Sequence, residues 1–576
     1  MEQPQVNTSL GGEPDGGSTM TMSSYLISTA LAAVTDVRVL ATIVATVALI
    51  LAAMGYLMRT TIDPREPPVL KPGIPIFGHA ISLVYSLLND SSGFYYRTYQ
   101  ANPSATMLTL PLPGDRRIYV IQNTQLMQAA LRNKNMTFDP FIQEFIGGML
   151  ALPKSTYDRL MAGTESGLMS TMTGVIQHGL MGDNLRATTR TVLDIIADNL
   201  NEMEKIRMDA GVEQIALASF WVWMRQTLAG ATTEALYGDF SPFRVNETLM
   251  EDLWTWDYHL PHILLAPSKL EYLLCPEGYF ARESLQKAFV SYFKEGHAAH
   301  PSVSPVIRQR AITLREYGWT HEDAGLVEHT LAAGSVQNAV PTMLWLFLTI
   351  LRKPEYLVRV QEEVKGLITV TKDEKTGKKT ATIDVGAVEE KAPFFVACYH
   401  ENVRVHKRII NTRRTTCDTE LGGYLLKKGS DVMMSIQVAS THRDVWGQNT
   451  GNPKEFDPSH FLPVDMSEMD DEEQKREEEL KKARKAAWIP FGGGKHLCPG
   501  RNLAFSEILG FTGVLLLGYE FWWDDDKKGN LPDIEPIKAR IPADIPIPDE
   551  GGNNRLTAVR MKRRRQWEGV RWAFEV

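Results

Sequence analysis

The chain has 576 residues, 44% of them hydrophobic, which is enough for one large globular domain or two smaller ones. Its formal charge of −8, from 61 basic and 69 acidic residues, argues against a nucleic-acid-binding protein, because such proteins are usually basic. The four cysteines form no C-x-x-C pair, so zinc ribbons and dithiol redox motifs are unsupported, and four cysteines in so long a chain do not make a disulfide scaffold. A reducing compartment is the simpler interpretation for the bulk of the chain.

The N-terminal region predicts a tail followed by a membrane anchor. Residues 1–38 begin polar and glycine-rich and are expected to form a disordered tail. Residues 39–58 provide about 20 uncharged, mostly apolar positions, enough to span a bilayer as one helix. A signal peptide fits less well, since the run starts far from the N-terminus and lacks a convincing cleavage site. The basic residues Arg59, Arg65 and Lys71 after the span predict a lumenal tail and a cytosolic body.

A proline-rich linker, residues 59–79, follows the anchor and is predicted to be stiff and extended. Residues 80–576 are expected to form one large globular domain. There, apolar residues at helical spacing predict mainly helices, and short alternating segments predict small strands. A polar stretch at 366–384 is expected to be a surface loop, and the charged stretch at 465–485 a solvated helix or loop. The fold class predicted is therefore mainly α with small β-sheets.

One cysteine lies in an unusual setting, the stretch FGGGKHLCPGRNLAF at residues 491–505. Pro499 is typical of the first position of a helix, so Cys498 is placed at a helix N-terminus, where the thiolate is favoured. The neighbouring glycines permit a tight turn and a close backbone approach. These features suit a metal ligand, although a buried structural cysteine would also fit this stretch taken alone.

The pattern formed by Phe491, Gly494, His496, Cys498 and Gly500 resembles the haem-binding loop of the cytochrome P-450 superfamily, F-x-x-G-x-R-x-C-x-G. The resemblance implies haem b with the thiolate of Cys498 as the axial iron ligand. One position departs from the pattern, because His496 replaces the usual arginine. A histidine there has a shorter reach toward a haem carboxylate and a charge that depends on pH.

Two further motifs support the resemblance. Glu401 and Arg404 match the E-x-x-R of the superfamily, and one helix face allows them to pair. His460 lies in PKEFDPSHF at the position of the family's third cluster residue, usually arginine. These three residues are expected to form a structural cluster. Arg413 matches an arginine that binds a haem propionate in the family, and Arg414 is the alternative.

The helix expected over residues 321–353 carries the largest departure. Members of the superfamily usually have an acid and an alcohol there, which deliver protons to bound oxygen, whereas this chain has Gln337 and Asn338. Amides cannot ionise but can orient water, so both are candidate catalytic residues. Pro341 cannot donate to the carbonyl of Gln337 and is expected to open the helix locally. This run resembles the cholesterol and oxysterol 7-alpha-hydroxylases and prostacyclin synthase.

We expect a single-pass enzyme of the endoplasmic reticulum membrane with a cytosolic, monomeric catalytic domain. The polar tail and the inserts indicate a fungal enzyme of specialised metabolism. The expected function is a membrane-anchored haem-thiolate monooxygenase that oxidises a lipophilic substrate such as a sterol, terpenoid or other specialised metabolite. Electrons would come from an NADPH–cytochrome reductase. Two alternatives remain open: a haem-thiolate isomerase or dehydratase that needs no external electrons, and a non-catalytic haem-binding sensor.

Overall fold

A computed structural model represents the protein. It describes residues 41–42, 44–46, 49, 60–71, 79–90, 92–267, 270–448, 451–523, 547 and 557–576. The expected tail, residues 1–38, lies outside the described residues, and so does most of the expected span. The few described positions of that span are helical.

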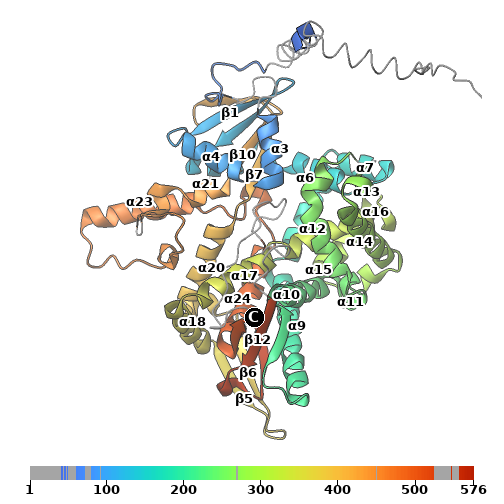
Figure 1. The fold of residues 1–576 in the computed structure, drawn as a ribbon, viewed down its shortest axis with the longest axis vertical. Coiled ribbons are helices and arrows are strands. Elements are labelled where there is room, and N and C mark those ends of the chain that lie inside the picture. The colour runs from blue at the N-terminus through green and yellow to red at the C-terminus, as the bar shows by residue number, and fades with distance from the viewer. Residues whose placement is uncertain are drawn as a thin grey trace, which may run out of the picture.

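Helices make up most of the body, with the sheets at its periphery (Figure 1). This arrangement confirms the predicted mainly helical class with small sheets. The α-helices are α3 (Ala80–Asn89), α4 (Gly93–Ala101), α5 (Thr124–Arg132), α6 (Asp139–Met149), α7 (Lys154–Met161), α8 (Leu168–Gly179), α9 (Gly182–Asp209), α10 (Phe220–Tyr237), α11 (Pro242–Val245), α12 (Leu249–Leu265), α13 (Glu271–Leu274), α14 (Pro276–Lys294), α15 (Pro305–Glu316), α16 (His321–Val336), α17 (Ala339–Leu351), α18 (Pro354–Gly366), α19 (Val388–Lys391), α20 (Pro393–His406), α21 (Ile436–Ser440), α22 (Arg443–Trp446), α23 (Asp471–Ala487) and α24 (Arg501–Gly518).

The largest sheet lies at one end of the body, next to α3 and α4 (Figure 1). Its strand order is β1 (Met107–Leu112), β2 (Arg116–Ile121), β10 (Asp431–Ser435), β7 (Ile410–Thr415) and β3 (Met136–Thr137). The smaller sheets are β11 (Tyr519–Trp523), β12 (Thr557–Arg563) and β4 (Ile215–Ser219); β13 (Val570–Glu575), β6 (Lys379–Asp384) and β5 (Ile368–Lys372); and β8 (Thr419–Leu421) with β9 (Tyr424–Leu426).

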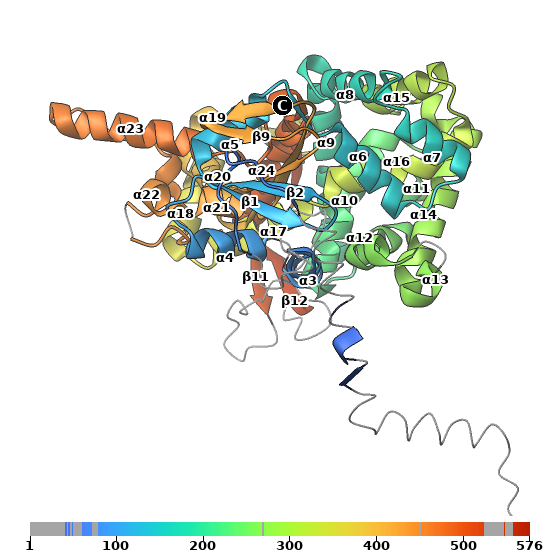
Figure 2. The same cartoon turned by 90° about the horizontal axis from the view of Figure 1, so that it is seen from above.

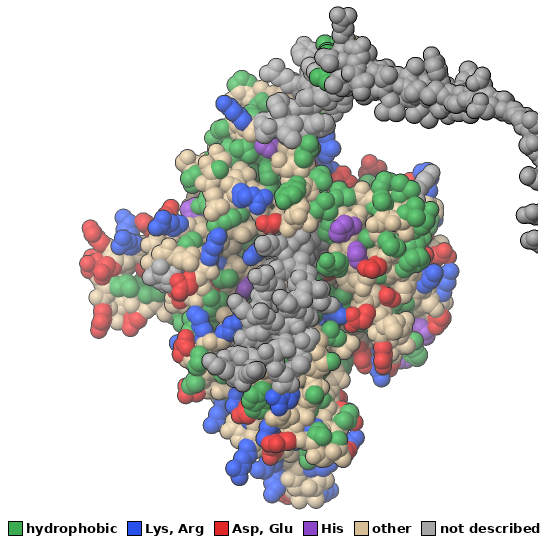
Figure 3. All heavy atoms as spheres, viewed as in Figure 1, with side chains coloured by type: hydrophobic (Ala, Val, Ile, Leu, Met, Phe, Trp, Pro, Cys, Tyr) green, Lys and Arg blue, Asp and Glu red, His purple; other side chains and the backbone are tan. Residues whose placement is uncertain are grey.

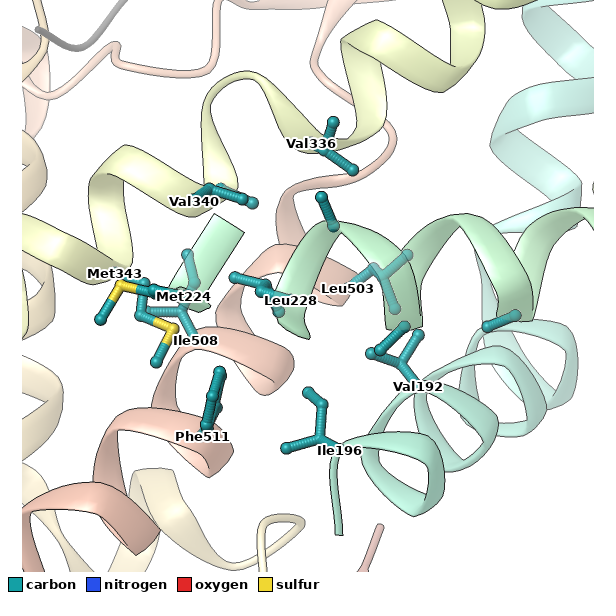
Figure 4. Close-up of a cluster of buried hydrophobic side chains, with 14 of the residues drawn as sticks. Val192, Ile196, Met224, Leu228, Val336, Val340, Met343, Leu503, Ile508 and Phe511 are labelled. Carbon is teal, nitrogen blue, oxygen red and sulfur yellow. The ribbon is translucent and has the colours of Figure 1, made fainter. Parts of the chain in front are cut away.

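Four helices, α9, α10, α17 and α24, meet in the main hydrophobic core. Figure 4 shows their apolar side chains pointing toward one another, among them Ile196, Leu228, Met343 and Phe511. All four of these side chains are fully buried. Because α24 follows directly after the loop that carries Cys498, this packing fixes the position of that loop.

The expected long helix over 321–353 is present as two helices, α16 and α17. It begins at a capping box in which Thr320 and Asp323 exchange hydrogen bonds, as the sequence indicates. The helical path is interrupted at Gln337 and Asn338 (Figure 4). Pro341 has no N–H to bond the carbonyl of Gln337, which explains the break.

Among the described residues, one stretch has the length and apolarity of a membrane span, and it is this broken helix, His321–Leu351. Its most apolar window is 72% buried inside the protein, so it is a core element.

The described part of the linker, residues 60–71, lies along the β1–β2 hairpin. The Thr60 hydroxyl donates to the carbonyl of Leu112 at 2.7 Å, and Val69 bridges to Thr109. The buried carboxylate of Glu66 accepts a 2.7 Å hydrogen bond from the Tyr119 hydroxyl. These contacts attach the segment directly to the sheet.

Two polar stretches adopt regular structure. The stretch 366–384, expected to be a loop, contains the hairpin β5–β6, and β6 pairs with β13 near the C-terminus. The prediction of a loop there was wrong, because β5 and β6 pair with each other and residues 570–575 contribute a second partner to β6. The stretch 465–485 contains most of α23, which begins at a capping box of Asp470 and Glu473 and projects from the body in both views (Figures 1 and 2).

Candidate active site

A cavity of about 420 Å³ lies where the break between α16 and α17 faces the start of α24. Its wall is mainly apolar and includes Leu331, Ala339, Val403 and Leu503. Cys498 is the one cysteine of the chain that lines it, and its thiol forms no disulfide. The structure thus places a single free thiol in a largely apolar chamber.

The loop before Cys498 is held by its own backbone. The N–H of Cys498 donates to the carbonyl of Phe491 at 2.9 Å, which closes the turn. Gly494 has a φ of +62°, and a Cβ on it would lie 2.4 Å from the carbonyl oxygen of Leu131. Glycine is therefore required there by both conformation and space. The predicted loop residues Phe491, His496, Cys498 and Gly500 all line the cavity, whereas Gly494 shapes the turn behind it.

The cavity has features that suit a flat cofactor bearing acidic groups. Gly500 lines it, and a Cβ there would meet nothing within 4 Å, so the cofactor plane can approach this backbone closely. Arg413 also lines the cavity and is 3% exposed. Its guanidinium donates to the carbonyls of Thr412 and Gly493, neither of which neutralises its charge, so that charge is available to a haem carboxylate. The residues present therefore fit haem.

Arg413 and its neighbour Arg414 have different environments. Burial lowers the pKa of Arg413 to about 10, so its guanidinium remains protonated at neutral pH. Arg414 points away from the cavity and pairs with Glu144 and Asp431 at 2.5 and 2.7 Å. The structure therefore places Arg413, and not the alternative Arg414, at the cofactor cavity.

His496 lines the cavity but is held on its outer side. Its Nε2 accepts from the backbone N–H of Phe138 at 3.4 Å and lies 3.5 Å from Oδ1 of Asp139. Burial lowers the pKa of His496 to about 4, opposed by Asp139 and reinforced by Arg413. The ring can exchange a hydrogen bond with a cofactor carboxylate, whose negative charge would in turn favour the protonated ring.

The predicted cluster is assembled and fully buried. Arg404 donates from Nε and Nη2 to the two oxygens of Glu401 at 2.7 and 2.6 Å, and also to the carbonyls of Ser440, Pro453 and Glu455. Nδ1 of His460 lies 3.3 Å from Glu401. The cluster therefore ties α20 to the segment that leads to the cysteine loop, and it lies outside the cavity lining.

The two amides of the helix break face different ways. Asn338 lines the cavity. The side chain of Gln337 is 4% exposed and does not line the cavity; its Nε2 donates to Oδ1 of Asp257 on α12 at 2.5 Å. Of the two candidate catalytic residues, Asn338 is thus positioned to touch a ligand directly, and Gln337 is not.

The cavity lining also contains two ionisable residues that the sequence did not single out. Lys407 is 7% exposed, and its Nζ lies 4.7 Å from the ring centroid of Phe491. Glu507 on α24 accepts from the Thr232 hydroxyl at 2.8 Å, and burial raises its pKa to about 8. A lone glutamate in the apolar run from Leu503 to Leu517 was the available sequence signal for the second residue.

Comparisons with known proteins agree with this geometry. The family model described as Cytochrome P450 matches residues 318–543. A Cytochrome P450 monooxygenase of the fungus Gibberella zeae is 29% identical over 91% of this chain and 94% of the relative. Cytochrome P450 monooxygenase nodJ of Hypoxylon pulicicidum is 24% identical over 93% and 97%. The solved structure of retinoic acid-bound cyanobacterial CYP120A1 has a TM-score of 0.59 and 15% identity, covering 87% of this chain and all of that chain.

The structural likeness shows the fold, and the relatives extend over nearly the whole chain. Both fungal relatives are named as monooxygenases, and the family ligates haem iron through a cysteine thiolate. With a single thiol in an apolar cavity that fits haem, the chain belongs to the cytochrome P-450 superfamily as a haem-thiolate monooxygenase.

Proposed function

We propose that this protein is a membrane-anchored monooxygenase that inserts one atom of O2 into a lipophilic substrate, such as a sterol, a terpenoid or another specialised metabolite. The observation that carries the proposal is the position of Cys498 in a largely apolar cavity below the break between α16 and α17. An apolar chamber of this kind favours a substrate that loses little hydration on entry. The two fungal relatives support an oxidative role.

Each residue of the site has a proposed role. Cys498 ligates the haem iron, and Phe491, Gly494 and Gly500 shape the cradle around it. Arg413 provides the charge for one haem carboxylate, and His496 provides a hydrogen bond near the other. When bound, the thiolate-ligated haem activates O2.

Asn338 is proposed to provide a polar group on the side of the cavity where oxygen binds. Asn338 orients the water and substrate that face the break, since its amide both donates and accepts hydrogen bonds. The cluster of Glu401, Arg404 and His460 holds the elements that carry the loop in place.

Exposed apolar side chains support attachment to the endoplasmic-reticulum membrane beyond the proposed anchor at residues 39–58. On α3, Tyr85 is 63% exposed, and in α13 Leu273 and Leu274 are 63% and 62% exposed. Phe280 on α14 is 64% exposed, and Figure 3 shows apolar side chains gathered over this upper right region of the body. A bilayer would cover such side chains, with the catalytic domain on the cytosolic side.

An NADPH–cytochrome reductase is proposed as the electron donor. Lys481, Lys482 and Lys485 on the C-terminal half of α23 are exposed, and such cations favour docking of an acidic partner. Arg501, whose Nη1 donates to the carbonyl of Cys498 at 2.9 Å, adds positive charge beside the loop.

The ferrous–CO difference spectrum of the full chain tests the ligand assignment. Wild-type protein is expected to show the Soret band typical of thiolate ligation, and Cys498→Ala is expected to lose it. Cys417→Ala, which removes an exposed thiol outside the cavity, is the matched control and should retain the band. A wild-type spectrum without this band in folded protein would refute the proposal.

NADPH dependence tests the type of reaction. Membrane-reconstituted enzyme with a reductase is expected to consume NADPH and O2 and to add one oxygen atom to the substrate. Conversion of substrate at the same rate without NADPH would instead identify an isomerase or dehydratase.

A further inference from the structure

The helix break lacks an ionisable side chain of its own, but a carboxylate reaches it from another element. Asp257 lies on α12, 80 residues before Gln337, and its Oδ1 accepts the 2.5 Å hydrogen bond from Gln337 Nε2. Both side chains are buried, at 3% and 4% exposure. We propose that Asp257 is the acid of the oxygen-side proton relay, supplied by α12 and held in place by Gln337.

The position of Gln337 connects this carboxylate to the cavity. Gln337 is the residue directly before Asn338, which lines the cavity, and both lie in the break between α16 and α17. Pro341 donates no hydrogen bond to the carbonyl of Gln337, so this acceptor is available to a water molecule within the break. On this proposal, water in the break carries the proton from Asp257 toward Asn338, while the amide of Gln337 holds the carboxylate in place.

The burial of Asp257 favours a functional role for its carboxylate over a purely structural one. A carboxylate removed from water is costly, and an apolar or amide residue at this position would bind Gln337 or pack beside it at lower cost. The next residue on α12, Tyr258, is 50% exposed, so Asp257 faces inward from a surface helix.

The reaction needs such a source of protons. Oxidation of a substrate by O2 takes up two electrons and two protons, and one oxygen atom leaves as water. The electrons come from NADPH through the reductase of the proposed function, on which this inference rests. Asp257 releases a proton toward the break and regains one from solvent, so its own charge is restored in each turnover. It touches neither substrate nor cofactor and is a positioning and relay residue.

Exchange of the two functional groups tests the proposal. In full-length holoenzyme with reductase, Asp257→Asn is expected to slow NADPH oxidation about tenfold or more, in the range that positioned acids contribute. The double variant Asp257→Asn with Gln337→Glu exchanges the two groups, so that residue 337 carries the carboxylate and residue 257 the amide. It is expected to recover most of the rate of NADPH oxidation. Asp252→Asn, which removes a half-buried carboxylate from the same helix, is the matched control and should leave the rate unchanged.

A second readout does not depend on turnover. The stretching frequency of carbon monoxide in the ferrous–CO holoenzyme responds to charge and hydrogen bonding in the oxygen pocket. It is expected to shift in Asp257→Asn, to return toward the wild-type value in the double variant, and to stay constant in Asp252→Asn. If Asp257→Asn fails to load haem, Gln337→Met, which cuts the hydrogen bond at similar length, takes its place in both measurements.

The outcomes separate this inference from the proposed function. A wild-type protein without a thiolate Soret band or NADPH oxidation overturns the proposed function and this inference with it. A wild-type protein that has both, together with variants whose rate or CO frequency equals that of the wild type, overturns the relay alone. Failure of the double variant to recover also overturns it, because a purely structural role predicts additive damage.

Discussion

The guanidinium of Arg404 binds the carboxylate of Glu401 through two parallel hydrogen bonds of 2.6 and 2.7 Å, and neither side chain is exposed to solvent. The same guanidinium donates to three backbone carbonyls from segments 36 to 51 residues away in sequence. The planar fork of arginine can satisfy all these acceptors at once, and no other side chain can. The pair therefore connects α20 to the chain that leads to the cysteine loop.

Arg404→Lys is expected to destabilise the fold by about 3–5 kcal/mol, since lysine leaves part of this buried network unpaired. Thermal unfolding of the apoprotein and the yield of haem-loaded protein check the prediction. Arg571→Lys is the matched control, because Arg571 and Asp198 form an ion pair that is 60% and 74% exposed. Such surface pairs contribute little, so the control should be nearly neutral. Equal effects of the two substitutions would contradict the structural role.

Gly494→Ala is expected to abolish haem binding. The added Cβ would lie 2.4 Å from the carbonyl of Leu131, and the φ of +62° already disfavours alanine, so the loop must move. Gly423→Ala serves as the control, since its φ of +82° imposes similar strain but its Cβ would meet nothing within 4 Å. Haem content per protein, measured by absorbance, distinguishes the two. A Gly494→Ala protein with full haem content would show that the loop can shift without loss of the site.

The amino-acid sequence predicts those parts of the site whose geometry is local. Glu401 and Arg404 are three residues apart on one helix, and Phe491 and Cys498 belong to one turn, so their spacing alone indicates the contact. The break at Gln337 follows from the proline four residues later. In each case the chain between the partners is too short to allow other arrangements.

Contacts between distant segments were not predictable in the same way. The hydrogen bond between Asp257 and Gln337 joins residues 80 positions apart and depends on how α12 packs over the broken helix. The sequence predicts a loop where β5 and β6 lie, because their polar residues hide a short alternation and the second partner of β6 is β13, almost 200 residues later. Tertiary packing decides these features, and local propensity carries little information about them.

Arg413→Gln is expected to weaken haem retention, because it removes a buried cation that lines the cavity and is still protonated at neutral pH. Transfer of haem to apomyoglobin measures the rate of loss, and we expect at least a several-fold increase, as one charge-assisted hydrogen bond contributes about 1.5–3 kcal/mol. Arg414→Gln is the adjacent control: it cuts the ion pairs to Glu144 and Asp431 but leaves the cavity intact. If both variants lose haem equally fast, the carboxylate contact is not specific to Arg413.

Glu507→Gln is expected to remove a pH dependence of stability. Burial raises the pKa of Glu507 in the folded protein to about 8, above its ordinary value near 4.5. The folded state thus keeps a proton that the unfolded chain loses, and wild-type stability should fall as pH rises from about 5 through about 8. Glutamine is neutral in both states and retains the acceptor for the Thr232 hydroxyl, so the variant should gain several degrees in Tm relative to wild type at pH 9 and little at pH 5.

Thermal unfolding of the holoenzyme, followed by the Soret band from pH 5 to pH 9, measures this difference in Tm between the Glu507→Gln variant and the wild type. Glu355→Gln changes an exposed glutamate and should follow the wild-type curve. Parallel curves for Glu507→Gln and wild type would show that the cavity holds Glu507 ionised.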